Sequence, residues 1–413
     1  MANHIETNYQ TELVALRAAE VAPYFTLGSK AYIEAGELVN KRNGQKYGFV
    51  IRSRGEVENQ LSVSAGAKKD IVERVVDLTI EPWHVYEKND AVEGKTDLQF
   101  DKEVAEMDGP ALIQGAVKKE IGRDVAKCAT CFVGKAGEFE PLSMASGHLS
   151  SITSEPLYAF CDPMIEAIVT SKGAQFVPVQ APAMYKAGLI GHFHGADYRS
   201  QRFIPRVKIS SAFATAMNGA TFASYSESNH VGTLTVTFGT AAASAFKIGK
   251  GTPLFIEGIV ACDTLGDETT QPYAFIVSED KSVASGAETV ELKVDEVPVS
   301  DIGNRVAAMD DGSVVVWSGD DKTVDTSTGV SIPEAGTYFA AIMRANGAYN
   351  FQTLDEIDVA TPESKKGAVQ GITVFQNRLT DLDNFETGTR FDTFTLAGTV
   401  EKRAQALILV KAK

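Results

Sequence analysis

Two cysteines three residues apart have the spacing best suited to metal or redox chemistry in this chain. Cys128 and Cys131 form a C-x-x-C pair, whereas Cys161 and Cys262 stand far from them and from each other. A structural zinc site needs a second close pair of ligands, and a thioredoxin-like pair should open a helix, where the dipole lowers a thiol pKa. Here the pair falls near the end of an expected helix. We therefore interpret the cysteines as buried apolar thiols.

Three other short patterns could carry chemistry, but each lacks the partners that the chemistry needs. His192 and His194 have the H-x-H form of some metal hydrolases, yet the chain holds six histidines in all and glycines flank this pair. The stretch 249–252 resembles part of a phosphate loop without its upstream glycine, so a hairpin turn explains it better. The acidic group at 381–386 misses the spacing of a calcium loop. The sequence predicts no metal, no cofactor and no enzymatic activity.

The composition is that of an ordinary globular protein with an acidic balance. The chain has 413 residues, 44% hydrophobic and 23% charged, and a formal net charge of −15. This charge argues against a dedicated nucleic-acid binder, which would show a basic footprint. No apolar run approaches the roughly 18 residues of a membrane span, so we expect no membrane partner. We also expect no secretory signal, because the N-terminus lacks a basic region and an apolar core.

The first third of the chain predicts an arm, a long hairpin and a long helix. Residues 1–40 form the expected arm, whose short helix ends at Pro23. Residues 41–80 predict an extended β-hairpin, and its first strand is basic, with no carboxylate between residues 41 and 55. Apolar residues at spacings of three and four then predict a helix over 108–133 that lies across a sheet.

The basic strand of this hairpin has two interpretations. Its five cations are Lys41, Arg42, Lys46, Arg52 and Arg54. A charge run of this kind is often only a solvated loop. The functional alternative is that the hairpin contacts an acidic surface of another copy of the chain. Four aspartates are the candidates for that surface: Asp355, Asp358, Asp381 and Asp383.

The middle of the chain adds a β-rich block to a mixed fold. Between residues 228 and 300, short runs of alternating apolar and polar residues are separated by turns that contain glycine. This pattern predicts a small, self-contained β-barrel or sandwich. Helix and strand patterns alternate over 154–227, and strands follow from 301 to a fully buried one at 406–410. Together the patterns predict an α+β fold with a compact β domain inserted into it.

The order of these elements resembles the major capsid (coat) proteins of tailed double-stranded-DNA bacteriophages, whose Hong Kong coliphage-type fold is shared with herpesviruses. Three stretches carry the likeness: residues 11–24, an acidic helix ending at a proline; residues 183–219, which lead into the block; and residues 246–259, a strand, a glycine turn and a strand. They are most similar to the short-tailed Salmonella phage group, whose coat carries an inserted telokin-like β domain. The insert of this chain is shorter.

The resemblance implies a division of the chain into seven parts. These are an N-terminal arm (1–40), an extended hairpin loop (41–80), a peripheral domain with a spine helix (81–153, helix 108–133), a first part of an axial domain (154–227), an inserted β-barrel domain (228–300), a second part of the axial domain (301–370) and C-terminal strands returning to the peripheral domain (371–413).

The function that the resemblance implies is structural. Pentamers and hexamers of the chain would assemble into an icosahedral shell around double-stranded DNA, in the virion and, during assembly, in the host cytoplasm. The implied partners are other copies of the chain, a scaffolding protein, a portal, and packaged DNA bound without sequence specificity. Two alternatives stay open: a phage tail, fibre or surface-layer protein with an inserted carbohydrate-binding β module, and a hydrolase or metal enzyme, which the missing catalytic constellation disfavours.

Overall fold

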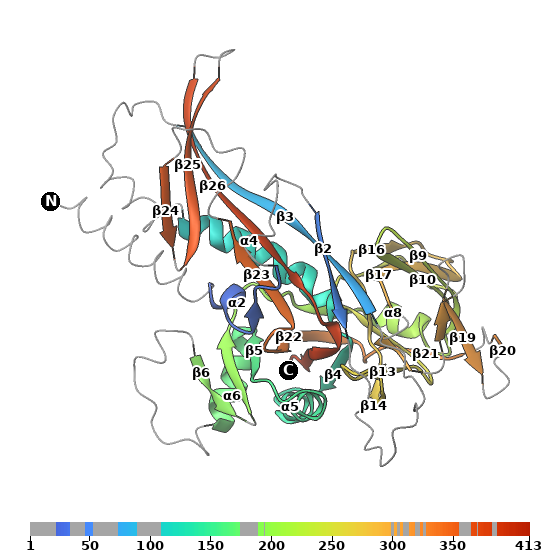
Figure 1. Cartoon of the computed structure of the whole chain (residues 1–413). Coiled ribbons are helices and arrows are strands. Elements are labelled where there is room, and N and C mark those ends of the chain that lie inside the picture. Colours follow the sequence, from blue (N-terminus) through green and yellow to red (C-terminus); the bar gives the residue numbers. More distant parts are fainter. Residues whose placement is uncertain are drawn as a thin grey trace, which may run out of the picture.

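The fold is α+β, as predicted, with two large sheets, helices packed on them and a block of short strands at one side (Figure 1). The computed structural model describes residues 22–33, 46–52, 73–88, 109–173, 189–193, 195–298, 301–303, 306–308, 314–318, 323–324, 328–354, 365–369, 371–381 and 386–413. Within these ranges, no helix is long and apolar enough to cross a membrane. The predicted arm helix before Pro23 lies outside them. A helical turn, α2 (Pro23–Thr26), begins at that proline.

The first sheet is built on two long antiparallel strands, β3 (Glu73–Lys88) and β26 (Glu386–Thr399), which run side by side in Figure 1. Successive side chains of β26 point to opposite faces, so Phe391 joins one hydrophobic cluster while Phe394 joins another. The other strands of this sheet are β1 (Ser29–Lys30), β2 (Lys46–Arg52), β23 (Tyr349–Thr353), β24 (Lys365–Val369) and β25 (Ile372–Asp381).

Helix α4 (Gly109–Asp124) packs against β3 and β26 but is shorter than the predicted helix over 108–133. A 3-10 turn (Val125–Lys127) follows it, and Thr130–Gly134 form strand β4. The prediction was wrong here because residues four apart share one face of a strand as well as one face of a helix. The β-branched and aromatic residues of β4 favour the strand.

The second sheet contains the C-terminal strand between two neighbours, β4 and β22. Its order is β4, β27 (Gln405–Lys411), β22 (Gly336–Ala345), β5 (Leu157–Cys161), β7 (Ala196–Ser200) and β6 (Leu189–Phe193), with β8 (Val207–Ile209) beside β22. Helices α5 (Glu140–Ile152) and α6 (Pro163–Gly173) pack against it. β27 is buried from residue 405 to 410, which confirms the prediction for 406–410. Because β27 belongs here, the predicted C-terminal part 371–413 is divided between the two sheets.

The block of short strands is organised around one sheet and three smaller ones. The sheet comprises β17 (Thr289–Asp295), β10 (Val231–Thr237), β9 (Thr221–Ser228), β19 (Val314–Ser318), β18 (Val306–Ala308) and β20 (Thr323–Val324). The smaller groups are β11 (Phe246–Ile248) with β16 (Lys281–Val283); β15 (Phe275–Ile276), β12 (Pro253–Ile256) and β21 (Val330–Ser331); and β13 (Val260–Cys262) with β14 (Glu268–Pro272). Helix α8 (Ser211–Ala216) begins at Ser210, whose hydroxyl accepts the Phe213 N–H.

The predicted limits of the block, residues 228 and 300, are not the limits of its sheets. β9 precedes residue 228 and pairs along β10. β19 and β21 follow residue 300 and pair with β9 and β12. Both segments predicted as axial therefore contribute strands to the block, and a self-contained inserted barrel is not confirmed.

Buried ion pairs also connect the block to the C-terminal part of the chain. Lys402 is almost completely buried, forms an ion pair with Asp295 and donates to the Glu296 carbonyl. The buried Arg403 lies 3.6 Å from Asp301. One hydrophobic cluster continues from α4 into the block. The block and the rest of the chain thus share a core.

Candidate assembly interface

The predicted hairpin is present where its strands are described. β2 and β3 pair antiparallel from Lys46 opposite Thr79 to Arg52 opposite Glu73, which confirms the predicted return strand. Lys46 is exposed at the start of β2, and Arg52 is the last residue of that strand. The remaining predicted cations, Lys41, Arg42 and Arg54, lie outside the described residues.

The return strand carries carboxylates that the composition of residues 41–55 does not reveal. In the ladder, Arg52 stands opposite Glu73, and Gly48 stands opposite Asp77. Opposite charges facing each other across two strands contribute roughly 0.2–1 kcal/mol. The hairpin is therefore of mixed charge. The pairing register decides which residues of β3 stand opposite the cations of β2.

The paired ends of β25 and β26 place two acidic residues opposite each other in the ladder. Asp381 ends β25 and stands opposite Glu386, the first residue of β26. Asp383 lies between these strands, outside the described residues, as do the other two candidates, Asp355 and Asp358. The structure thus places one of the four predicted aspartates, at the end of a long two-stranded ribbon.

Arg52 and Asp381 lie at opposite ends of the β3 ribbon. Arg52 stands opposite Glu73, the first residue of β3, whereas the last residue of β3, Lys88, stands opposite Gly388, near the start of β26. Strand β3 has 16 residues, and at roughly 3.3 Å per residue it spans about 50 Å. Figure 1 shows β2 at one end of β3 and the paired ends of β25 and β26 beyond the other. The two groups cannot meet within one copy of the chain.

Residues 22–33, here called the N-terminal segment, are fixed to β23 by backbone pairing and side-chain amides. β1 pairs with β23 in parallel. The side chain of Asn350 accepts the Tyr32 N–H at 2.9 Å, and that of Gln352 donates to the Ile33 carbonyl. These contacts place the start of the described chain against the first sheet.

A buried arginine, which the sequence analysis missed, completes this attachment. Arg344 of β22 is fully buried and donates to the carbonyls of Tyr24 and Leu27, the latter at 2.6 Å. Its guanidinium lies 4.3–4.8 Å from the ring centroids of Tyr24, Phe160 and Tyr349. Stacked cations of this kind attract the ring faces most strongly when water is excluded. The sequence signal that could have identified this residue is an arginine within the apolar run of strand β22.

Two carboxylates of α4 are buried near the same attachment. Asp124 is 1% exposed and accepts hydrogen bonds from the hydroxyls of Tyr24 at 2.6 Å and Thr399 at 3.0 Å. Glu120 is 3% exposed and pairs at 2.8 Å with Arg123, which also pairs with Glu81 of β3. Both carboxylates lie on the apolar side of the helix, three or seven residues after Val117. That spacing could have identified them.

Burial dominates the acid–base behaviour of this cluster. Loss of water around Glu120, together with the charge of Asp124, raises the pKa of Glu120 to about 8. Loss of water also raises the pKa of Asp124, although the hydrogen bond from Tyr24 acts in the opposite direction. A buried carboxyl group resists ionisation because the interior solvates its charge poorly.

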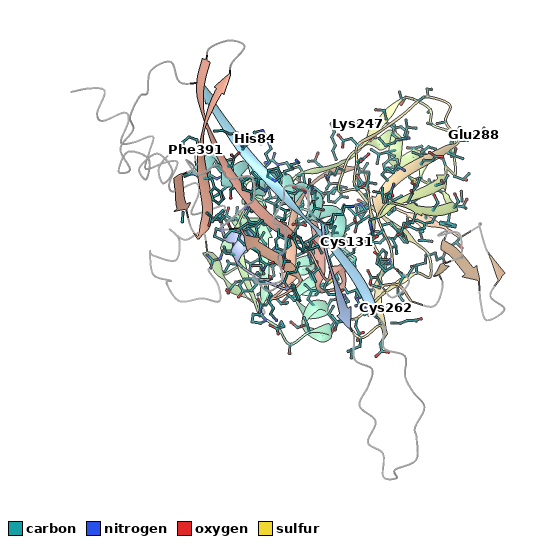
Figure 2. The ribbon with its side chains drawn as sticks, turned by 45° about the horizontal axis from the view of Figure 1, so that its top comes forward. His84, Cys131, Lys247, Cys262, Glu288 and Phe391 are labelled. Atoms are coloured by element: carbon teal, nitrogen blue, oxygen red, sulfur yellow. The ribbon has the colours of Figure 1, made fainter. Side chains whose placement is uncertain are left out.

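The sequence patterns considered for chemistry have structural roles. Cys128, Cys161 and Cys262 are buried and Cys131 is partly buried, which largely confirms the core interpretation; Figure 2 shows Cys131 and Cys262 among the densely packed side chains. Burial raises the pKa of each thiol, the opposite of a redox cysteine. The described residues contain no group of three potential metal ligands among His, Cys, Asp and Glu.

The stretch 249–252 is a turn, though not the predicted hairpin turn. The strands on either side, β11 and β12, belong to different sheets. The Thr252 hydroxyl donates to the Gly249 carbonyl at 2.6 Å, and Asp280 accepts the Lys250 N–H at 2.9 Å. A carboxylate therefore already occupies a backbone donor that a phosphate would need. His192 lies in β6, and His194 is outside the described residues.

Comparisons with known proteins give matches among solved structures. No protein-family model and no curated protein matches the chain. The head structure of Helicobacter pylori bacteriophage KHP40 matches with a TM-score of 0.44 and 7% identity, covering 94% of this chain and 87% of that chain. The capsid of Ralstonia phage GP4 gives 0.42 and 8%, covering 91% and 86%. A structure from Mycobacterium phage Che8 gives 0.41 and 9%, covering 93% and 90%.

Proposed function

We propose that this chain is a structural shell subunit, a major capsid protein of the tailed-phage type, and that its copies join head to tail. In the proposed contact, the β2–β3 hairpin of one copy meets the paired ends of β25 and β26 of the next. One observation carries the proposal: Arg52 and Asp381 stand at the two ends of a ribbon about 50 Å long. The phage heads and capsids among the matched structures agree with the proposal but do not carry it.

A contact between two different ends of the same molecule is heterologous. Such contacts generate rings when the rotation closes and filaments when it does not. Rings of five and six copies combined in one shell require the subunit to bend.

The proposed contact is individually weak, and this suits reversible assembly. An exposed ion pair contributes about 0.2–1 kcal/mol, and Glu73 already faces Arg52 within the hairpin. A charge pair of this kind sets orientation and partner choice more than affinity. The shell is proposed to be icosahedral, to enclose double-stranded DNA, and to involve a scaffolding protein and a portal, in the virion and in the host cytoplasm during assembly.

Charge exchange between the two ends tests the contact. We expect Arg52→Glu with Arg54→Glu to abolish particles while the circular dichroism of the subunit stays unchanged. The reciprocal variant, Asp381→Lys with Asp383→Lys, should fail in the same way. The chain that carries all four substitutions should recover particles, because each end again meets the opposite charge on the next copy.

The matched control reverses the charge of two lysines away from both ends. Lys208 and Lys281 are exposed, and changing both to glutamate alters the net charge by the same amount as the hairpin variant. This control should assemble normally. Normal particle yield from the hairpin double variant, or no recovery in the fourfold variant although it folds, would contradict the proposed contact.

A further inference from the structure

Four elements meet at the buried carboxylates of helix α4. Asp124 holds the hydroxyls of Tyr24, from the N-terminal segment, and Thr399, from β26. Glu120 reaches β3 through Arg123 and Glu81. We call this group, Tyr24, Glu81, Glu120, Arg123, Asp124 and Thr399, the carboxylate junction. The junction joins the N-terminal segment to β3 and β26, the long strands at whose ends the proposed contact lies. The stability of the junction therefore affects how firmly the segment is attached to these strands.

Within the junction, three carboxyl groups share one bonded cation. Its carboxyl groups are Glu81, Glu120 and Asp124, and the cation bonded to them is Arg123. Other charged or titratable groups act on it from the neighbouring elements: Lys127 after the helix, Lys250 from the β11–β12 turn, and Arg344 and Tyr349 from β22 and β23. A buried charge without full compensation is costly.

We propose that Glu120 is a proton-controlled latch, which fastens α4 to β3 and the N-terminal segment while protonated and loosens both when it ionises. Glu120 is 3% exposed. Its partner Arg123 is 38% exposed, and Glu81, which also pairs with Arg123, is 26% exposed. Solvent therefore reaches the rim of the junction, from which the proton can leave. This inference does not depend on the proposed shell function.

The direction of the pH response depends on which form of the junction, closed or opened, binds the proton of Glu120 more tightly. The pKa of Glu120 rises from its usual 4.5 to about 8 in the folded chain, mainly through burial. The closed junction thus binds the proton more tightly than the opened one, and closure weakens as the pH rises between these two values. The opening equilibrium increases by up to about tenfold per pH unit in that window.

A tryptophan of β3 provides a local probe. Trp83 is 8% exposed, donates to the Thr395 hydroxyl at 2.8 Å and lies 5.0 Å from the Lys119 ammonium. The chain has two tryptophans. In the variant Trp317→Phe, all tryptophan emission therefore comes from Trp83. Hydrogen exchange of residues 22–33, corrected for the intrinsic effect of pH, reports on the N-terminal segment directly.

We expect the full chain carrying Trp317→Phe to lose protection over 22–33 by up to about tenfold per unit from pH 5 to pH 8, with a red shift of Trp83 emission. Adding Glu120→Gln keeps this position neutral at every pH, so both signals should change much less than in the parent. Glu291→Gln, an exposed carboxyl of β17, should respond like the parent. An unchanged pH response in Glu120→Gln would overturn the latch, as would a folded parent with no response.

A second variant covers the case in which Glu120→Gln fails to fold. The charge of Glu81 is among the causes that raise the pKa of Glu120. In Glu81→Gln the pKa of Glu120 should therefore be lower. The loss of protection over residues 22–33 should then level off at a lower pH than in the parent. A response that ends at the same or a higher pH would also overturn the latch.

Discussion

Replacing Arg344 by methionine would remove the cation that holds the N-terminal segment. Arg344 donates to the buried carbonyl of Tyr24 and to the partly buried carbonyl of Leu27, and a carbonyl left buried without a partner costs about 1–3 kcal/mol. Methionine fills part of the space and keeps apolar contact with the rings around it. We therefore expect a loss of about 4 kcal/mol, a large part of the roughly 5–15 kcal/mol that stabilises a typical domain.

Urea unfolding of the unassembled subunit measures this loss, and limited proteolysis locates it. The N-terminal segment should become the first site of cleavage, because its carbonyls lose their buried partner. Arg206→Met is the matched control. Arg206 is 59% exposed, pairs with Asp162 at 3.6 Å and lies 5.0 Å from the Phe339 ring, so its loss should cost about 1 kcal/mol or less.

Two outcomes would refute the reasoning about Arg344. One is a free energy of unfolding within about 1 kcal/mol of the parent, which would mean that burial of the guanidinium had cost as much as its contacts return. The other is a large loss of stability with no increase in cleavage between residues 22 and 33, which would place the effect in β22 and not in the attached segment.

Two further predictions concern backbone space and the limits of the block. Gly239→Ala should lower stability by about 1–3 kcal/mol or more, because its Cβ would lie 2.0 Å from the Asn218 carbonyl oxygen, whereas Gly147→Ala, in α5 with open space, should raise it by up to about 1 kcal/mol; equal urea midpoints would contradict this. A fragment of residues 228–300 should give an undispersed amide spectrum, since it lacks strands β9, β19 and β21, and 219–335 should give better dispersion; a dispersed spectrum from the short fragment would restore a self-contained domain.

The sequence predicts elements well where one local pattern has one structural meaning. The apolar run at 406–410 is too hydrophobic for an exposed strand, and β27 is buried on both faces. The basic hairpin has a return strand, β3, that begins within the predicted residues 41–80 and continues to Lys88. The end of α4 was predicted wrongly, because apolar spacings of four suit both a helix and a strand, and Thr130–Gly134 take the strand.

The buried polar groups could not be predicted in the same way, because distant parts of the chain bury them. Asp124 meets Tyr24, which is 100 residues away, and Arg344 meets the carbonyl of that tyrosine across 320 residues. The limits of the block fail for a related reason: β9 and β19 look like flanking strands until their pairing partners are known. A local pattern shows which residues alternate but not what covers them.

The mass of the assembled protein tests the central proposal most directly. The full chain, expressed with and without a co-expressed scaffolding protein, is sedimented and imaged by negative stain. A shell subunit gives closed particles of megadalton mass, and the hairpin charge reversal reduces them to free subunits or single rings. Small oligomers alone, elongated fibres, or flat sheets and filaments under every condition would contradict the account.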